Sequence, residues 1–243
     1  MQTRLRAALF AIIFSAAAGP VLAADLPSSQ APALAPAPLF ETYDPFQIRL
    51  RVEGVIPTSG DNLVYTGGTP YHNGLTVQSQ VIPELDLSYY FTRNIAVEAI
   101  CCFSYHTINA VNALASLGDV GHTWLFPPTI TLQYHFTDFG AFQPYLGVGV
   151  NYTHYFDTGA GSLAADGPLK INDSWGVAGQ VGFDYMITRN LGLNVDLKYI
   201  EMTPHAAYVS STLNSRVNIN PIVVGAGITY RFGGGSNAVI AKY

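Results

Sequence analysis

The run FQIRLRVEG at residues 46–54 constrains the fold more than any other stretch of this sequence. Its apolar residues fall on one face of an extended chain, and its Gln, Arg and Glu residues fall on the other. A period of two predicts a β-strand. In a soluble sandwich the apolar face packs a core, whereas in a membrane barrel it meets lipid and the charged face lines the interior. The run alone leaves both folds open.

The first residues are typical of an export signal. Arg4 and Arg6 precede a short apolar run, and Val21 and Ala23 place small residues before a cleavage site. We therefore predict a signal peptide over residues 1–23. The Ala- and Pro-rich residues 24–45 then form an extended periplasmic leader.

Composition favours a membrane barrel over a secreted sandwich. Charged residues make up 11% of the chain, against about 25% in ordinary soluble domains, while aromatic residues make up 12%. After the signal peptide, no apolar run is long enough for a membrane-spanning helix. Loss of the two signal-peptide arginines changes the net charge from −5 to −7. This acidic balance argues against nucleic acid as a partner.

Pairs of aromatic residues at positions i and i+2 recur along the chain. Each pair ends an alternating run, and the second members lie 45, 49 and 47 residues apart. One hairpin per repeat predicts four hairpins, and therefore eight strands. The pairs are Tyr89/Phe91, Tyr134/Phe136, Phe183/Tyr185 and Tyr230/Phe232. The predicted strands are 46–56, 80–91, 95–106, 128–136, 144–156, 174–186, 191–202 and 218–232.

These aromatic pairs decide between the two folds. All four lie on the apolar face of their strands and at the same end, as expected for rings at a membrane interface. That end has short turns, whereas long connections at 57–79, 107–127, 157–173 and 203–217 join the strands at the other. We therefore predict an all-β, eight-stranded antiparallel transmembrane barrel of the outer membrane over residues 46–232. Residues 233–243 form a tail.

The same alternation places ten charged side chains inside the barrel. Eight strands enclose a space that side chains can fill, so we expect these charges to pair across it as a polar plug. A charged permeation path is the alternative that the sequence leaves open. The ten residues are Arg49, Arg51, Glu53, Glu84, Asp86, Glu98, Asp184, Asp196, Lys198 and Arg231.

No catalytic, metal or cofactor site is predicted. The histidines lack a paired spacing for metal ligation. Ser104 and His106 share a strand face with Glu98, which leaves a lipid hydrolase as an alternative. A Ser and a His two residues apart on a strand arise easily by chance, so we predict that the protein is not an enzyme.

Prolines lie near the strand ends opposite the aromatic pairs. Pro83, Pro127, Pro128 and Pro221 each lack an N–H and so remove a ladder hydrogen bond. They either weaken the wall and open a side exit, or simply mark where strands begin. The sequence leaves both alternatives open.

Several stretches together resemble the OmpW family of outer-membrane proteins. They are LFPPTITLQYHF at 125–136, PYLGVGVNYTHYFD at 144–157, DSWGVAGQVGFDYMITRN at 173–190 and the closing TYRF at 229–232. The resemblance implies an eight-stranded barrel, inserted by the barrel-assembly machinery and associated with the passage of small hydrophobic molecules. The implied route enters an apolar upper interior and leaves sideways into the bilayer lipid.

On this route, Phe126, Trp175, Pro127 and Pro128 are the expected solute-contacting residues. Strict alternation turns Trp175 toward lipid, so its assignment depends on the loop geometry. A structural barrel whose outer loops bind a partner above a plugged interior is the alternative function.

The barrel topology predicts which segments reach the cell surface. A peptide tag inserted within residues 157–173 should be labelled on intact cells, whereas a tag after Tyr243 should be labelled only after the outer membrane is permeabilised. Antibody labelling of both strains measures this, and the reverse pattern would contradict the predicted orientation.

Overall fold

The computed structural model describes residues 44–58, 62–210 and 214–234. The predicted signal peptide, nearly all of the leader and residues 235–243 of the tail lie outside the described residues. Three short 3₁₀ helices occur among the strands: η1 (Asn112–Leu117), η2 (Thr137–Phe139) and η3 (Gly161–Asp166). In the described part of the chain, no helix has the length and apolar character needed to cross a membrane.

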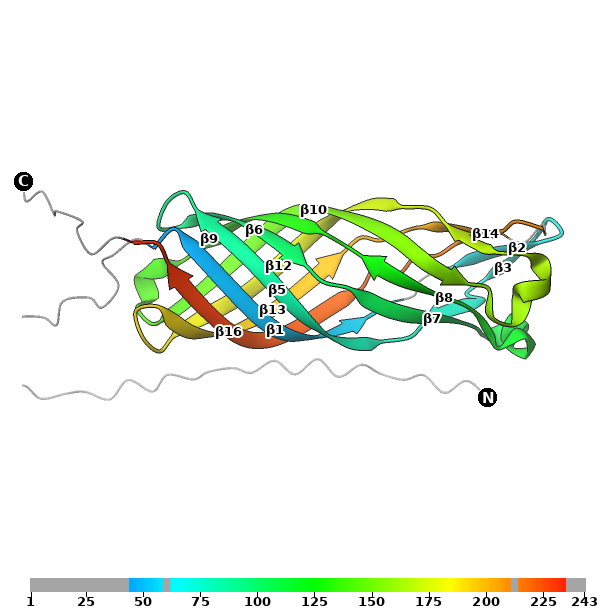
Figure 1. The fold of residues 1–243 in the computed structure, drawn as a ribbon, viewed down its shortest axis with the longest axis horizontal. Coiled ribbons are helices and arrows are strands. Elements are labelled where there is room, and N and C mark those ends of the chain that lie inside the picture. Colours follow the sequence, from blue (N-terminus) through cyan, green and yellow to red (C-terminus); the bar gives the residue numbers. More distant parts are fainter. Residues whose placement is uncertain (1–43, 59–61, 211–213, 235–243) are drawn as a thin grey trace, which may run out of the picture. The chain divides into compact units, whose positions relative to one another are not determined.

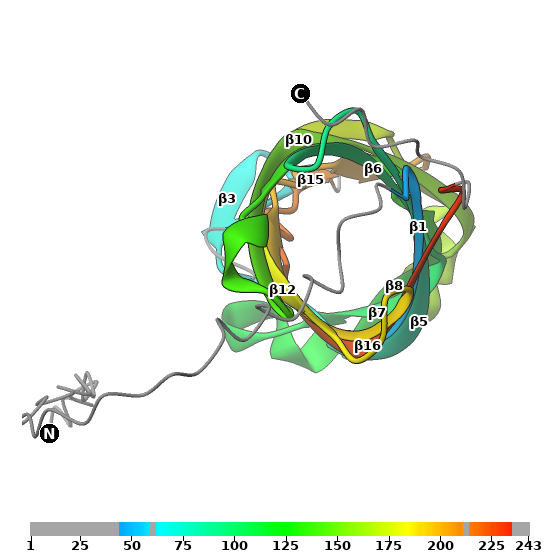
Figure 2. The same cartoon turned by 90° about the vertical axis from the view of Figure 1, so that its left-hand side faces the viewer.

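Eight antiparallel strands close into a ring, as Figures 1 and 2 show. Each pairs with its neighbours, and the last returns to the first with Phe46 opposite Phe232 and Ile56 opposite Ile222. The predicted fold is therefore confirmed. The ring strands are β1 (Phe46–Ile56), β5 (Gln80–Tyr90), β6 (Ile95–Cys101), β9 (Thr129–His135), β10 (Phe142–Gly159), β12 (Ser174–Met186), β13 (Leu191–Ile200) and β16 (Ile222–Phe232).

The polar face of each strand points into the ring. In β1, Arg49 and Arg51 are buried, while Leu50 and Val52 on the opposite face are 52% and 63% exposed. Exposed apolar side chains on a closed sheet fit a wall that meets lipid. The run FQIRLRVEG therefore belongs to a membrane barrel.

The four long connections carry further strands, so their prediction as plain loops was wrong. Several of these strands are only three or four residues long, and some pair with partners distant in sequence, such as β15 with β2, which local periodicity does not reveal. Together they form the loop-end extension of the wall. These strands are β2 (Leu63–Thr66), β3 (Thr69–His72), β4 (Leu75–Val77), β7 (Ser104–Ala110), β8 (Asp119–Phe126), β11 (Leu169–Ile171), β14 (His205–Tyr208) and β15 (Asn214–Arg216).

One predicted strand is interrupted. The sequence predicts a single strand over 95–106, but β6 ends at Cys101 and β7 begins at Ser104. β6 pairs with β9, whereas β7 pairs with β8 and β4 in the loop-end extension. The wall therefore changes partners at residues 102–103.

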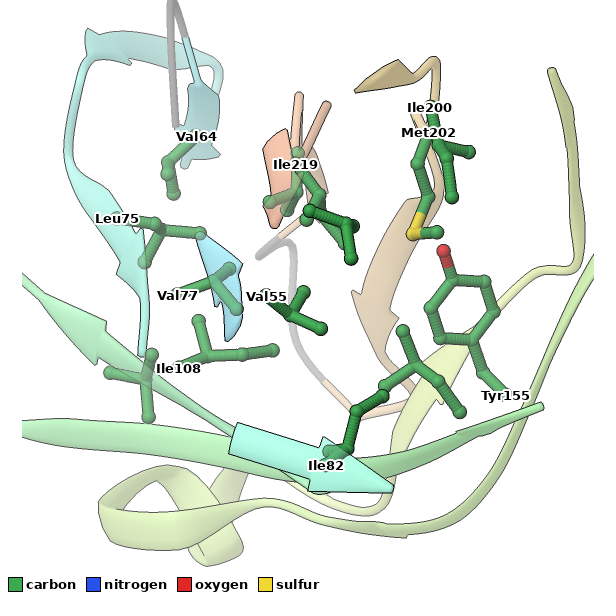
Figure 3. Close-up of a cluster of buried hydrophobic side chains, with 14 of the residues drawn as sticks. Val55, Val64, Leu75, Val77, Ile82, Ile108, Tyr155, Ile200, Met202 and Ile219 are labelled. Carbon is green, nitrogen blue, oxygen red and sulfur yellow. The ribbon is translucent and has the colours of Figure 1, made fainter. Parts of the chain in front are cut away.

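The interior is apolar at the loop end. Side chains from the ring and from the loop-end extension point toward one another there, and Figure 3 labels ten of them. Val55 and Ile82 come from ring strands, while Leu75 and Ile108 come from the loop-end extension. A polar interior near the aromatic pairs thus gives way to an apolar interior beyond them.

The aromatic pairs lie on the outer face of the wall. Phe46 joins the rim that they form, because its ring centroid lies 5.3 Å from that of Tyr89 and 5.6 Å from that of Phe232. Aromatic rings in this position suit a membrane–water interface. Two of the eight paired residues, Phe183 and Phe232, are half-buried, and six are exposed: Tyr89, Phe91, Tyr134, Phe136, Tyr185 and Tyr230.

Phe91 and Phe136 lie outside the strands that the sequence assigns to them, so both predicted strand ends were wrong. β5 and β9 each end one residue earlier. The Phe91 N–H donates to the Ile95 carbonyl at 2.9 Å, which closes the turn of its own hairpin. The Phe136 N–H donates to the Pro144 carbonyl at 2.8 Å, but proline has no N–H to return a second ladder bond. The two rings therefore belong to the turns, where they stay exposed on the outer face.

The Phe183/Tyr185 pair departs from the repeat seen in the sequence. The ring centroids of the other three pairs lie 5.1, 4.9 and 6.2 Å apart. Phe183 instead packs on Phe142 at 5.1 Å. Phe142 can take this contact because it lies opposite Tyr185 in the β10–β12 ladder. Tyr185 is thus 49% exposed without a ring partner among the described residues, a difference from the other pairs that the spacing does not predict.

The two copies of the sequence TRN make the same turn. The Thr92 hydroxyl accepts from the Ile95 N–H at 2.9 Å, and Thr188 accepts from the Leu191 N–H at 2.9 Å. In each copy the Asn side chain reaches the neighbouring strand: Asn94 donates to the His135 carbonyl, and Asn190 donates to the Arg231 carbonyl, both at 2.7 Å. These turns therefore fasten three strands, not two.

We expect Asn94→Ala to lower the free energy of unfolding by about 1 kcal/mol, because it removes a hydrogen bond to a neighbouring strand. Arg93→Ala, at the exposed centre of the same turn, is the matched control and should change stability little. Urea unfolding in lipid vesicles measures both. Equal effects of the two substitutions would contradict the role given to Asn94.

Candidate functional site

The structure places all ten predicted charges on the inner face of the ring strands. Nine of them are buried, and Arg231 is half-buried near the turn end. They are Arg49, Arg51, Glu53, Glu84, Asp86, Glu98, Asp184, Asp196, Lys198 and Arg231. This set is called the polar plug below. Its members lie close enough to form ion pairs across the barrel.

Arg49 joins three strands at the turn-end half of the polar plug. Its Nε and Nη2 donate to the two carboxylate oxygens of Asp184 at 3.2 and 2.9 Å, and its Nη1 donates to Glu98. The fork of a guanidinium matches a carboxylate in this bidentate geometry. Arg49 therefore ties β1 to β12 and β6.

Arg51 and Lys198 form the other half of the polar plug. Arg51 Nη2 donates to Glu84 at 2.8 Å and also to Asp86. The ammonium of Lys198 donates to Glu53 at 2.8 Å and to Glu84 at 2.5 Å. Glu84 thus accepts from two cations on different strands, which links β1, β5 and β13.

Neutral donors complete the polar plug. The Tyr145 hydroxyl donates to Asp196 at 2.7 Å, and the Gln180 amide donates to Glu98 and Asp196 at 2.9 Å. They compensate in part for the six carboxylates, which outnumber the four cations. Single carboxylate oxygens of Asp86 and Asp196 still lack a hydrogen-bond partner among the described residues.

Three cavities follow one another from the loop end to the polar plug. The outermost is lined by Leu114, Leu117 and Leu163 from η1 and η3, and it shares Ile108 with the middle cavity. The middle cavity shares His106, Leu125 and Ile219 with the innermost one. Shared lining residues make the three cavities a continuous series.

The innermost cavity, called the chamber below, rests directly on the polar plug. Glu53, Glu84 and Lys198 form its floor. Its walls are mostly apolar, and its remaining lining residues are Val55, Ile82, Ile100, Cys102, Ser104, His106, Leu125, Pro127, Thr129, Ile200, Met202, Ile219, Pro221 and Val223. The chamber therefore has mostly apolar walls and is closed below by charge pairs.

The chamber borders a stretch of wall without strand pairing. The β5–β6 ladder ends where Leu85 meets Cys101, and beyond it the next backbone bond joins Gln78 N–H to the Thr107 carbonyl at 3.1 Å. Between these points, no ladder pair links residues 79–84 to residues 102–106 within the described strands. These two segments are called the unpaired stretch below.

The prolines differ in their surroundings. Pro83 lies in the unpaired stretch and points outward. The break at Pro127 and Pro128 is bridged, because the Asn151 amide donates to the Pro127 carbonyl at 3.2 Å and the Tyr152 N–H donates to the Pro128 carbonyl at 3.1 Å. These bonds lie on the β10 side; on the opposite side, toward residues 101–103, the β6–β9 ladder ends at Ile100 and Thr129 and no ladder pair is found until Ser104 meets Leu125 in the described structure.

The structure corrects the placement of both aromatic residues expected in the apolar interior. Trp175 is 72% exposed and lies on the outer wall, where its ring packs 4.8 Å from that of Tyr152. Phe126 also faces outward, because Leu125 takes the inward position of β8. The ring of Phe126 stacks on Phe103 at 4.8 Å and covers the interruption at residues 102–103 from outside.

The three residues of the hydrolase alternative are not brought together. His106 uses its Nδ1 to bond the Gln78 carbonyl at 2.8 Å, while Glu98 is held by Arg49 in the polar plug. Ser104 and His106 do share the chamber wall. Without a carboxylate on the imidazole, the nucleophile–base–acid arrangement is incomplete.

The family model described as "OmpW family" matches residues 44–232. This chain belongs to the OmpW family. The match spans every ring strand and the loop-end extension, so the polar plug and the chamber both lie within it. OmpW-family relatives are outer-membrane proteins, and the closed barrel is an integral protein of that membrane.

Similar proteins cover nearly the same length. The uncharacterized outer-membrane protein y4mB of Sinorhizobium fredii is 42% identical, covering 94% of this chain and 96% of its own. Outer membrane protein W of Vibrio cholerae is 36% identical, covering 82% and 94%. The crystal structure of OprG from Pseudomonas aeruginosa has a TM-score of 0.72 at 29% identity, covering 81% and 99%.

Breaking the polar plug should destabilise this OmpW-family barrel. Arg49→Met leaves Asp184 and Glu98 without their guanidinium, and a buried pair that loses one partner costs about 3–5 kcal/mol. Arg189→Met is the control, since Arg189 is 43% exposed and lies 4.0 Å from its acidic neighbour. Urea unfolding measures both, and an unchanged midpoint for Arg49→Met would mean that water solvates these charges.

Proposed function

We propose that this protein lets small hydrophobic molecules cross the outer membrane by entering the series of cavities at the loop end and leaving sideways into the bilayer. One observation carries the proposal: the apolar series of cavities ends on the polar plug and borders the unpaired stretch. A solute in the chamber is blocked below and meets its weakest wall at the side.

The polar plug supports sideways exit, not passage through the barrel. Further descent would separate buried partners such as Lys198 and Glu53, which costs several kcal/mol. Lipid instead offers an apolar solute about 0.8 kcal/mol per CH₂ removed from water. Ions and sugars gain nothing comparable, so the proposal excludes them as solutes.

The unpaired stretch supports the exit itself. Where two ring strands are paired, separating them breaks ladder hydrogen bonds, each contributing about 1 kcal/mol. Between residues 79–84 and 102–106, a solute has only side chains to displace. The stacked rings of Phe103 and Phe126 lie on the outer face of the adjacent wall. The surface around the proposed exit is therefore apolar.

The proposal includes no enzymatic step. It takes outer-membrane lipid as the surroundings, small hydrophobic molecules as the solutes and the barrel-assembly machinery as the route of insertion. An interaction barrel whose loops bind a partner predicts no dependence of uptake on the chamber, so the same experiment separates the two functions.

Filling the chamber should block uptake without preventing assembly. Ile82→Trp inserts a large ring into the chamber, whereas Val81→Trp places the same ring on the outer face, where Val81 is 73% exposed. At equal surface expression, we expect Ile82→Trp to reduce uptake of a labelled short alkane to that of cells lacking the protein. Val81→Trp should match the wild type, and sugar uptake should be the same in all strains.

Equal alkane uptake by the Ile82→Trp and Val81→Trp strains would contradict the proposal. Equal uptake with and without the wild-type protein would favour the interaction barrel.

A further inference from the structure

The chamber carries one polar strip on an otherwise apolar wall. Ser104 and His106 are both buried on the inner face of β7, two residues apart, and both line the chamber. Other lining side chains, such as Ile82, Ile219 and Val223, are apolar. Two hydrogen-bonding groups in such surroundings distinguish solutes by more than their size.

The hydrogen bond of His106 fixes which of its nitrogens faces a solute. Its Nδ1 lies 2.8 Å from the Gln78 carbonyl, which can only accept, so Nδ1 carries the proton. His106 is buried, and no described carboxylate bonds to its ring, so the neutral imidazole is favoured over the charged form. The neutral ring therefore presents a lone pair on Nε2, for which the described residues supply no donor.

Ser104 supplies the complementary group. Its hydroxyl has no hydrogen-bond partner among the described residues, and a hydroxyl can donate as well as accept. Residues i and i+2 of a strand lie about 7 Å apart. Both side chains point into the chamber from neighbouring positions on the same strand face, so one solute oxygen between them can approach both polar groups.

We propose that Ser104 and His106 form a recognition site for the hydroxyl group of an apolar alcohol, with the alkyl chain in the chamber. The solute O–H donates to Nε2 of His106, and its oxygen accepts from the Ser104 hydroxyl. This inference rests on the proposed function and names a solute class for it. An ether of the same size satisfies Ser104 but leaves Nε2 without a donor.

Two isomers test this directly: 1-hexanol and methyl pentyl ether have the same atoms and differ in the O–H. Binding is measured on the full-length protein in lipid nanodiscs. We expect the alcohol to bind about tenfold more tightly, as one additional neutral hydrogen bond allows. The ¹⁵N chemical shift of His106 Nε2 should change when the alcohol is added and should not change when the ether is added.

Three variants locate the effect. His106→Leu should abolish the preference for the alcohol. Ser104→Ala should weaken the binding of both isomers. His154→Leu makes the same change on the outer wall, where the His154 side chain is 51% exposed, and should leave the preference intact.

The outcomes separate the inference from the proposed function. Equal binding of both isomers to the wild type, or a preference that survives in His106→Leu, overturns the recognition site and leaves the chamber as a solute site. If neither isomer binds, both the recognition site and the proposed function are overturned. The wild-type ¹⁵N measurement keeps the inference testable if His106→Leu fails to assemble.

Discussion

The interior of an eight-stranded barrel is narrow, and this one contains ten charged side chains. Isolated charges cannot remain in so small a space away from water without a large loss of free energy. The structure meets this constraint by pairing: Arg49, Arg51 and Lys198 each contact at least two carboxylates from other strands. The ring strands are therefore held together inside as well as along their edges.

In the proposed function, this pairing also decides where a solute can go. The polar plug blocks one half of the interior, and the loop-end extension adds an apolar half above it. The chamber lies at the boundary, beside the unpaired stretch, where no ladder pair joins residues 79–84 to residues 102–106. Passage, in our proposal, follows from these three features together, because none of them alone would turn a solute sideways.

The strand pattern could be predicted from the sequence because alternation is a local property. All eight ring strands follow from it, although Phe91 and Phe136 show that it overruns the strand ends by a residue. The interruption at residues 102–103 could not be predicted, since Cys102 keeps the inward parity and Phe103 the outward one. Only the change of pairing partner, a long-range property, reveals the break.

The errors at the candidate site have the same origin. Trp175 was placed inside against its own parity, and Phe126 was placed inside because no strand was predicted before Pro127. The true lining residues, such as Ile82 and Ile108, follow the inward parity of their strands. Extending the alternation of β7 into the connection would have found Ile108, whereas the three-residue strands β4 and β11 carry too short a pattern to be recognised.

The polar plug has a consequence for how the barrel forms. Arg231, from the last strand, donates to Gln47 of the first at 2.6 Å, across 184 positions of sequence. Lys198 and Glu53 are joined across 145. In a chain that has inserted only its first strands, Arg51 can pair with Glu84, but Glu53 still lacks Lys198, and contacts of such long range form slowly. The ion pairs of the polar plug are therefore complete only when the last strands join the first.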